Sequence, residues 1–230
     1  MFRFKQFSIV QEKSAMKVGT DGVLLGAWAA MEHPQNILDI GSGTGLVSLM
    51  LAQRFPKARI HGIEIEENAF LESQLNVENS PFAQRCHVEW TSLQDFESNQ
   101  SFDLIVSNPP FFDWTHSDKT SRNLARQQSD LTFEELLFYS KKWMNEHAKL
   151  AYVIPYLTES KMLTIAESLD LYPEKITRVK GHAQADFKRS LLLLGQEKVA
   201  SQVDELTIEL ERHVYSEAYI ELTKAFYLKM

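Results

Sequence analysis

Cysteine is nearly absent from this chain of 230 residues, which contains only Cys86. A single thiol excludes an intramolecular disulfide and a metal site built from several thiolates, so a reducing compartment is the natural setting. Long apolar runs are also missing. No stretch approaches the roughly 18 apolar residues that a transmembrane helix needs, and the first residues do not lead into a secretory signal. We therefore expect a cytoplasmic protein that does not associate with a membrane.

Positive charge is also scarce, because 24 basic residues face 31 acidic ones and the formal net charge is −7. Neutralisation of phosphates by Lys and Arg supplies much of the affinity for nucleic acids, so this balance argues against such a partner unless positive charge gathers locally. Two segments meet that condition. Residues 1–20 hold four basic side chains and one acidic, and residues 171–190 hold five and two, so each sums to +3. The acidic excess lies elsewhere, mainly in residues 204–221, which predicts an asymmetric field.

Alternating strands and helices begin at Asn36, a pattern that predicts an α/β fold with a mainly parallel sheet covered by helices on both faces. With 44% hydrophobic residues, the chain is long enough to bury the core of one larger domain. Seven strands are predicted, at residues 36–40, 59–65, 86–90, 102–106, 150–155, 175–180 and 189–195. Helices are predicted at residues 46–54, at 66–77 with apolar positions Ala69, Phe70, Leu71, Leu75 and Val77, at 160–169, and from Thr132, where Glu135 completes a capping box.

A polar ledge follows the strand at residues 102–106, with the sequence Ser107-Asn108-Pro109-Pro110-Phe111. The two prolines fix φ and remove two backbone donors, which leaves bare carbonyls, one side-chain amide and one aromatic face. A planar group that carries an NH2 suits this set, because Asn108 Oδ1 and the Pro109 carbonyl accept its hydrogens while Phe111 stacks on its ring. The alternative is a strand that stops at a Pro-Pro turn, with Phe111 in the core.

A glycine loop, Asp39-Ile40-Gly41-Ser42-Gly43-Thr44-Gly45, follows the first strand of the sheet and precedes a helix. The acid Glu64 ends the next strand, 64 − 45 = 19 residues after the last glycine of the loop. A strand, a glycine turn, a helix and an acid about 20 residues on are typical of a nucleotide site in which the acid accepts from a ribose diol. The spacing is Gly-x-Gly-x-Gly, which favours S-adenosylmethionine over a dinucleotide.

Together, the loop, the acid and the ledge resemble the class I, Rossmann-like methyltransferases that act on a planar NH2 nitrogen. The runs Phe4 to Trp28 and Tyr215 to Leu228 resemble more narrowly the bacterial tRNA1(Val) adenine-N6 methyltransferases, which modify adenine 37 beside the anticodon. The resemblance implies one domain over residues 1–230, with an arm and cofactor-covering segment at 1–30 and a Rossmann-like core of seven strands at 31–230. It also implies S-adenosylmethionine as cofactor, valine-accepting tRNA as partner, a monomer, and no metal.

The same resemblance assigns roles to individual residues. Asn108, Pro109, Pro110 and Phe111 are the predicted catalytic residues, with Phe112 as a second stacking candidate. The cofactor is expected to contact the segment before the helix at Val23, the glycine loop, the acid and the amide of the ledge: Lys17, Gly19, Thr20, Asp21, Asp39, Gly41, Gly43, Gly45, Glu64 and Asn108. Ser92 stands where the family often has an acid that binds the cofactor adenine, with Asp95 three residues later; Asp95 alternatively caps the turn.

A long polar stretch, residues 113–130, follows the ledge and is expected to form a substrate-binding lid with Arg122 and Arg126; the alternative is a surface loop without a role. Three rival functions stay open from the sequence. The first is another nitrogen methyltransferase with the same ledge, acting on guanine N2 of ribosomal RNA or on a release-factor glutamine. The second is a non-catalytic cofactor sensor or RNA-binding module. The third is a nicotinamide dehydrogenase, which the glycine spacing disfavours.

Overall fold

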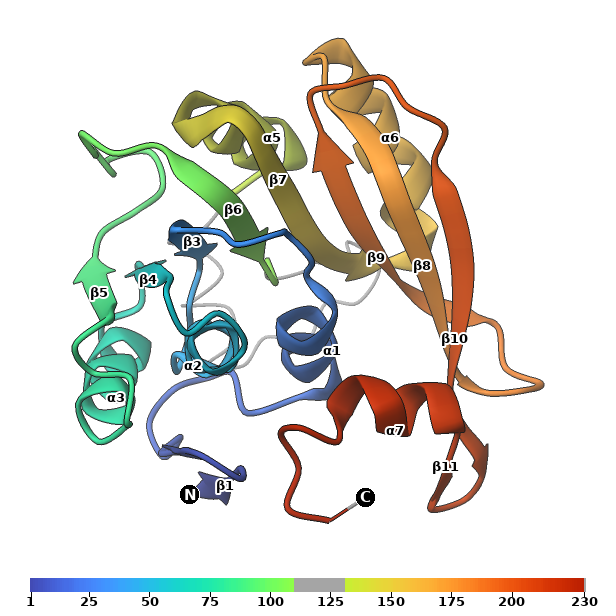
Figure 1. The fold of residues 1–230 in the computed structure, drawn as a ribbon, viewed down its shortest axis with the longest axis horizontal. Helices are drawn as coiled ribbons and strands as arrows, with labels where there is room; N and C mark the ends of the chain where they lie inside the picture. Colours follow the sequence, from blue (N-terminus) through green and yellow to red (C-terminus); the bar gives the residue numbers. More distant parts are fainter. Residues whose placement is uncertain (110–130, 230) are drawn as a thin grey trace, which may run out of the picture.

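A central sheet organises the computed structural model, which describes residues 1–109 and 131–229 (Figure 1). Its strands, in chain order, are β3 Asn36–Ile40, β4 Arg59–Glu64, β5 Cys86–Trp90, β6 Phe102–Ser107, β7 Met144–Pro155, β8 Tyr172–His182, β9 Phe187–Gly195, β10 Gln202–Glu211 and β11 Val214–Tyr215. Among the described residues these nine strands lie in the order β11-β10-β8-β9-β7-β6-β3-β4-β5. Strand β9 runs antiparallel to β7 and β8, and β11 runs antiparallel to β10, whereas all other neighbours are parallel.

The sheet is therefore wider than the seven strands predicted from the sequence. All seven are present, and β10 and β11 extend the sheet beyond β8. Strand β10 does carry a period-two pattern in Leu206, Ile208 and Leu210, but Thr207 and Glu209 stand between these positions and three more acids lie in the same strand, Asp204, Glu205 and Glu211. Because β11 covers only a short part of its outer edge, most side chains of β10 stay partly or fully exposed and tolerate charge. The sequence therefore indicated an acidic segment here and gave no prediction of the strand.

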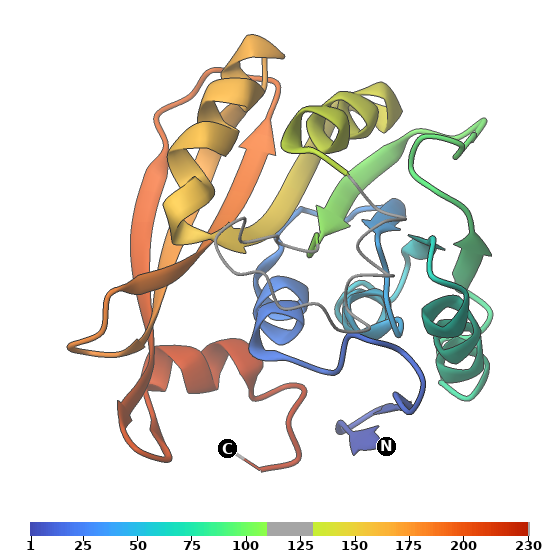
Figure 2. The same cartoon turned by 180° about the vertical axis from the view of Figure 1, so that it is seen from behind.

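Helices cover both faces of the sheet (Figures 1 and 2). Their bounds are α1 Thr20–Trp28, α2 Leu46–Arg54, α3 Glu67–Glu78, α5 Phe133–Trp143, α6 Glu159–Ser168 and α7 Glu217–Thr223, with a 3-10 turn η1 at Tyr156–Thr158. One hydrophobic cluster joins the sheet to α1, α2, α3 and α7, and a second joins the opposite face to α5 and α6. Successive side chains of β6 alternate between them, with Leu104 in the first and Ile105 in the second. None of the described helices combines the length and apolarity needed to cross a membrane.

Local sequence accounts for most helix starts. The predicted capping box of α5 is confirmed, since Thr132 Oγ1 accepts from the Glu135 amide at 3.1 Å and Glu135 Oε2 accepts from the Thr132 amide at 3.0 Å. Thr20 and Asp21 are the first two residues of α1 and do not cap it. Helix α1 begins after Gly19, which makes no side-chain cap in the described structure, and the Asp21 carboxylate pairs with Arg189 of β9 instead.

The two ends of the chain pack against each other (Figure 1). A small hairpin of β1 Phe2–Arg3 and β2 Ser8–Ile9 forms the predicted arm. The Lys5 amide donates to the Phe226 carbonyl at 2.8 Å, and the Phe4 and Tyr227 rings stack at 5.9 Å. The arm is thereby fixed to the body of the molecule through the carboxyl-terminal segment.

Candidate active site at the carboxyl edge of the sheet

The glycine loop, Glu64 and Asn108 come together at one edge of the sheet. In the parallel register, Ile40 of β3 lies opposite both Ile63 of β4 and Ser107 of β6. Along the chain, Gly41 follows Ile40, Glu64 follows Ile63 and Asn108 follows Ser107. The carboxyl ends of three neighbouring strands therefore present Gly41, Glu64 and Asn108 side by side. In open α/β sheets, ligands bind at this edge. The structure thus unites the motifs that lie 67 residues apart in the sequence.

The glycine loop has the backbone conformation that its composition predicts. Gly41, Gly43 and Gly45 have φ values of 68°, 56° and 81°, in the left-handed region. The amides of Gly41 and Ser42 both donate to the Ile63 carbonyl at 2.9 Å, and the Gly43 amide donates to Glu64 Oε2 at 2.7 Å. The loop is therefore held against β4 through backbone donors.

Glu64 is buried at this edge and is nearly saturated with backbone donors. Its Oε1 accepts from the amides of Ile65 and Glu66 at 2.9 and 2.8 Å, and its Oε2 accepts from Gly43. Burial raises the pKa of this carboxyl despite these three hydrogen bonds, which act to lower it. Two carboxylate oxygens offer about four acceptor positions, so roughly one remains on Oε2. That free acceptor position suits a single hydroxyl of a ribose diol.

Asp39 lies behind the loop instead of lining an opening. Its side chain is 1% exposed, and Ser48 of α2 donates to its Oδ2 at 2.6 Å. Burial raises the pKa of Asp39 to about 7, with a further rise from the nearby Glu64 charge, while Ser48 lowers it. The described contacts connect β3 to α2, and a direct contact with cofactor stays a prediction.

Replacing Asp39 with asparagine should change how stability depends on pH. The folded-state pKa of about 7 lies above the ordinary value of 3.8, so Asp39 contributes stability that is present below pH 3.8 and is lost as the pH rises towards 7. Between those values the loss approaches about 1.4 kcal/mol per pH unit. Denaturant unfolding of D39N should therefore show stability rising relative to wild type from pH 5 to pH 8. The exposed Asp186→Asn is the control, and parallel pH curves for D39N and wild type would contradict the assignment.

Helix α3 holds the segment before α1 through buried polar side chains, which the sequence analysis missed. Glu72 Oε1 accepts from the amides of Glu12 and Lys13 at 2.6 and 2.7 Å, and Oε2 accepts from Ser14 at 3.1 Å. Asn76, one turn later, exchanges hydrogen bonds with Val10 and donates to the Thr44 carbonyl of the glycine loop at 2.9 Å. These two side chains therefore connect the amino-terminal segment to the glycine loop.

The apolar positions predicted in α3 are only partly buried, because polar side chains occupy the inner side of this helix. Leu71 and Leu75 are 49% and 44% exposed, while Glu72, Ser73 and Asn76 are buried. The inner side of this helix faces backbone amides and carbonyls of other segments, so polar residues stabilise it better than leucine would. Glu72 and Asn76 lie four residues apart, between the apolar residues Ala69 and Val77. This spacing puts them on one side of the helix and could have revealed the polar inner side.

The Glu72→Gln variant should loosen the segment at residues 12–14. A neutral amide offers one acceptor oxygen where the carboxylate has two, so at least one buried backbone donor loses its charged partner, at a cost of about 1.5–3 kcal/mol. Hydrogen exchange followed by mass spectrometry should show the amides of residues 12–14 exchanging about tenfold faster or more. Glu78→Gln, at the exposed end of the same helix, provides the matched control. Equal exchange in the two variants would show that Glu72 does not hold the segment.

The start of α1 is brought to the same edge of the sheet. Arg189 of β9 lies opposite Pro155 at the carboxyl end of β7 and pairs with Asp21. This contact positions Gly19 and Thr20 near the ends of the parallel strands. Lys17 instead donates to the backbone carbonyls of Gln11 and Glu12 within its own segment. Its contact with cofactor stays a prediction.

A cavity of about 420 Å³ lies beyond the ends of β4 and β5. Its lining residues are Ile65, Glu67, Trp90, Thr91, Ser92 and Asp95. Trp90 stacks on Phe70 with an interplanar angle of 17° and donates to the Ile65 carbonyl at 3.0 Å. Ser92 Oγ donates to Asp95 Oδ2 at 2.6 Å and accepts from the Asp95 amide at 3.0 Å. The open pocket combines the apolar Ile65 and Trp90 with polar side chains, a mixture that suits a flat heteroaromatic ring, and both sequence candidates, Ser92 and Asp95, line it.

Of the ledge, the structure describes Asn108, which is half-buried, and Pro109, which is buried. The other predicted substrate and catalytic residues lie outside the described residues: Pro110, Phe111, Phe112, Arg122 and Arg126.

The positive charge predicted at residues 171–190 is largely balanced by acidic partners. Arg178 binds both oxygens of Glu159 at 2.7–3.1 Å, and Arg189 pairs with Asp21. Two further pairs join β8 to β10, Lys175–Asp204 at 3.2 Å and Lys180–Glu205 at 3.3 Å. The expected basic surface on this segment is therefore much weaker than its net charge of +3 indicates.

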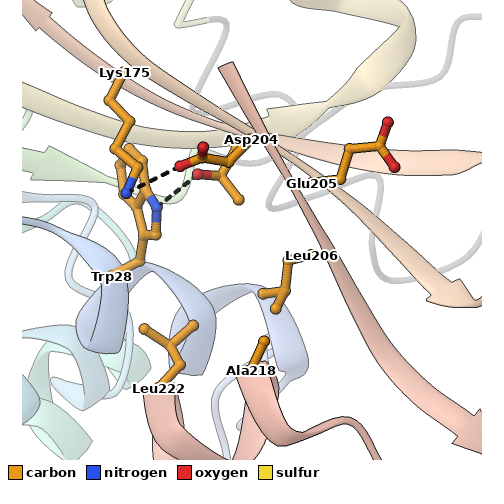
Figure 3. A pocket seen from close by; sticks show the side chains of 8 residues that line it. Trp28, Lys175, Asp204, Glu205, Leu206, Ala218 and Leu222 are labelled. Atoms are coloured by element: carbon orange, nitrogen blue, oxygen red, sulfur yellow. Dashed lines mark hydrogen bonds and ion pairs between the residues drawn. The ribbon is translucent and has the colours of Figure 1, made fainter. Parts of the chain in front are cut away.

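A second cavity, of about 360 Å³, lies between α1, α7 and the first halves of β8 and β10 (Figure 3). Trp28 donates to Thr177 Oγ1 at 2.9 Å beside the Lys175–Asp204 pair. None of the residues that line this second cavity was predicted from the sequence to contact cofactor or substrate. The carboxyl edge of the sheet stays the candidate site.

Comparisons with known proteins agree on a family. The model described as "Methyltransferase small domain" matches residues 13–147. The chain is 48% identical to the tRNA1(Val) (adenine(37)-N6)-methyltransferase of Flavobacterium johnsoniae, over 100% of both chains. It is 45% identical to the protein of that name from Parabacteroides distasonis, over 100% of this chain and 98% of the relative. Its fold is similar to a predicted O-methyltransferase from Agrobacterium tumefaciens, with a TM-score of 0.69 at 16% identity, covering 90% of this chain and 96% of that one.

Proposed function

Because this chain belongs to the tRNA1(Val) (adenine(37)-N6)-methyltransferase family, we propose that it transfers the methyl group of S-adenosylmethionine to N6 of adenine 37 in tRNA1(Val). The observation that carries the proposal at atomic level is the register of β3, β4 and β6. It sets the glycine loop, Glu64 and Asn108 side by side at the carboxyl edge of the sheet.

The residues at this edge fit S-adenosylmethionine. The remaining acceptor position of Glu64 suits a ribose hydroxyl, and the open pocket lined by Ile65 and Trp90 suits the adenine ring. The rim formed by Ser92 and Asp95 offers acceptors for the adenine amino group. When bound, the cofactor supplies an electrophilic methyl group on a sulfonium, and its remainder is a neutral thioether.

Asn108 and Pro109 are proposed to hold the nucleophile. The N6 amine of adenine is a poor nucleophile because its lone pair is delocalised into the ring. If Asn108 Oδ1 and the Pro109 carbonyl accept its two hydrogens, the nitrogen is drawn towards tetrahedral geometry and its lone pair is aligned with the methyl carbon. The same acceptors stabilise the positive charge that develops on nitrogen as the N–C bond forms and the C–S bond breaks. One proton then leaves the product amine for solvent.

The substrate is proposed to be the anticodon loop of a valine-accepting tRNA, which places the reaction in the cytoplasm. A base in a loop leaves its stack at lower cost than one in a duplex. Stacking on Phe111, worth roughly 1–3 kcal/mol per base, is the proposed compensation, with Phe112, Arg122 and Arg126 as further substrate contacts. We propose that the chain acts as a monomer.

Methyl transfer from labelled S-adenosylmethionine into total tRNA and, in separate reactions, ribosomal RNA and a release factor tests the proposal. Nuclease digestion and mass analysis should identify N6-methyladenosine in a valine tRNA. A transcript of that tRNA with guanine in place of adenine 37 is the matched control and should stay unlabelled.

Three outcomes would contradict the proposal in different ways. Label in ribosomal RNA alone would favour guanine N2 as the acceptor, and label in a release factor alone would favour a glutamine amide. Bound cofactor with no acceptor in any fraction would favour the sensor function.

A further inference from the structure

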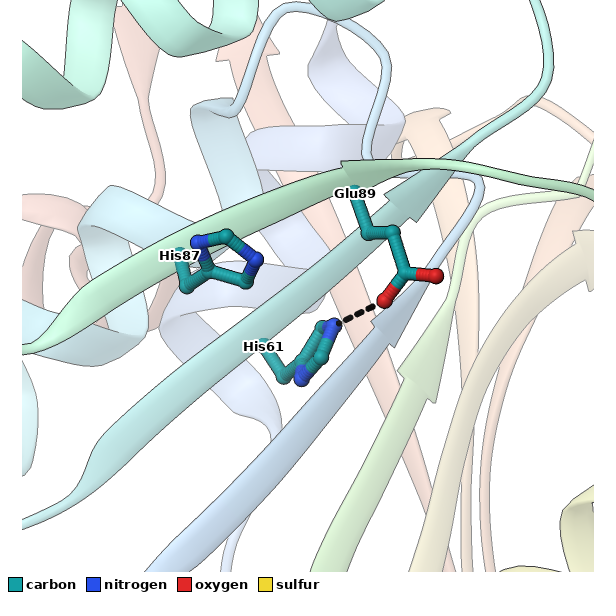
Figure 4. Close-up of side chains that lie close together, drawn as sticks. All are labelled: His61, His87 and Glu89. Carbon is teal, nitrogen blue, oxygen red and sulfur yellow. Dashed lines mark hydrogen bonds and ion pairs between the residues drawn. The ribbon is translucent and has the colours of Figure 1, made fainter. Parts of the chain in front are cut away.

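Two histidines and a glutamate gather on β4 and β5, outside the proposed active site (Figure 4). The parallel register sets His61 of β4 directly opposite His87 of the edge strand β5. Since strand side chains alternate with a period of two, Glu89 points to the same face as His87. One potential ligand atom from each of the three side chains lies within 4.8 Å of the others.

The cluster is partly ordered by its surroundings. His61 Nε2 lies 3.2 Å from Glu89 Oε2, and the His61 and His87 rings meet edge to face at 5.1 Å. Phe96 contacts the His61 ring edge to face at 5.2 Å. His61 is therefore held by its neighbours, while the exposed His87 and the half-exposed Glu89, which contacts His61, lie on the solvent side of the cluster.

Two imidazoles and one carboxylate match the donors of a zinc site with one position left for water. Bonds of about 2.0–2.2 Å in tetrahedral geometry separate ligand atoms by roughly 3.4 Å. Metal binding would therefore require the solvent-facing side chains of His87 and Glu89 to rotate and reduce the present spread of 4.8 Å. Harder ions such as Mg²⁺ prefer oxygen ligands and fit this donor set poorly.

We propose that His61, His87 and Glu89 bind one divalent transition-metal ion, with Zn²⁺ as the best match, and that the ion ties edge strand β5 to β4. The transfer of a sulfonium methyl needs no metal, so this site is independent of the proposed reaction. The ion stabilises the strand that leads into the cavity-lining residues Trp90 and Thr91.

Zn²⁺ titration of the full, untagged chain after treatment with chelator tests the site. Calorimetry should show one equivalent bound, and thermal unfolding should shift upwards with Zn²⁺ but not with Mg²⁺. Even the loss of a partner that only orients a ligand costs roughly 10–100-fold in metal affinity. Loss of the His87 imidazole in H87A should therefore weaken Zn²⁺ binding by about 100-fold or more.

The controls separate this site from adventitious binding. His87 is exposed, so H87A should unfold like wild type without metal. H147A, at an exposed histidine of β7, should bind Zn²⁺ like wild type, and E89Q should bind more weakly. Co²⁺ bound by wild type should give visible absorption bands that H87A lacks. Equal Zn²⁺ affinity in wild type and H87A, or loss of binding in H147A, would overturn the proposal.

Discussion

Asn108→Ala is expected to slow methyl transfer by about 10²–10³-fold, the range found when one preorganised hydrogen-bonding group is removed from a charge-stabilising site. Alanine removes the side-chain acceptor at the end of β6 and leaves the strand and its buried Ser107–Ile40 hydrogen bond in place. The affinity for S-adenosylmethionine should change much less, because the glycine loop and Glu64 provide most of the proposed cofactor contacts. Single-turnover rates and calorimetric binding of the cofactor separate the two effects.

Two further variants make this test specific. Asn108→Asp keeps acceptor oxygens, so it should retain more activity than N108A. Asn99→Ala, at an exposed asparagine between β5 and β6, should behave like wild type. If N108A transferred methyl groups at the wild-type rate, the acceptor role and the proposed mechanism would both be wrong.

The correct predictions from the sequence mostly concern features that a short stretch of chain determines by itself. Helix α2 occupies Leu46–Arg54 as predicted, and the Thr132–Glu135 capping box forms because both partners lie within one turn. The glycine loop and the acid of β4 were recognisable for a similar reason. Alternating strands and helices impose parallel pairing, which brings the ends of neighbouring strands together.

The errors arose where a distant segment decides the role of a residue. Glu72 is buried because amides about 60 residues earlier in the chain need an acceptor, which helical periodicity does not reveal. Asp21 pairs with Arg189, 168 residues away, and not with its own helix start. The positive charge of residues 171–190 is likewise balanced by acidic partners on α1, α6 and β10, so the expected positive field is weakened. Composition alone therefore overstated the positive field of this segment.

A comparison of Gly43→Ala and Gly45→Ala should separate loop strain from cofactor binding. Both glycines have left-handed φ values, which cost an L-residue about 1–2 kcal/mol. A β-carbon on Gly45 would lie 2.7 Å from Ser73 Oγ, whereas one on Gly43 would meet no described atom within 4 Å. G45A should therefore lose about 1–3 kcal/mol more unfolding free energy than G43A, because the added methyl group overpacks α3.

The cofactor affinity should reverse that order. A methyl group on Gly43 would enter open space on a loop whose amide binds Glu64, the proposed ribose acceptor, so G43A should bind S-adenosylmethionine about tenfold more weakly or worse, a loss of about 1.4 kcal/mol or more. Gly181→Ala, near the carboxyl end of β8, has open space and no left-handed φ, and should match wild type in both measurements. Wild-type cofactor affinity in G43A would mean that the open side of the loop faces something other than cofactor. The proposed site would then have to be moved away from Gly43, whatever the effect on stability.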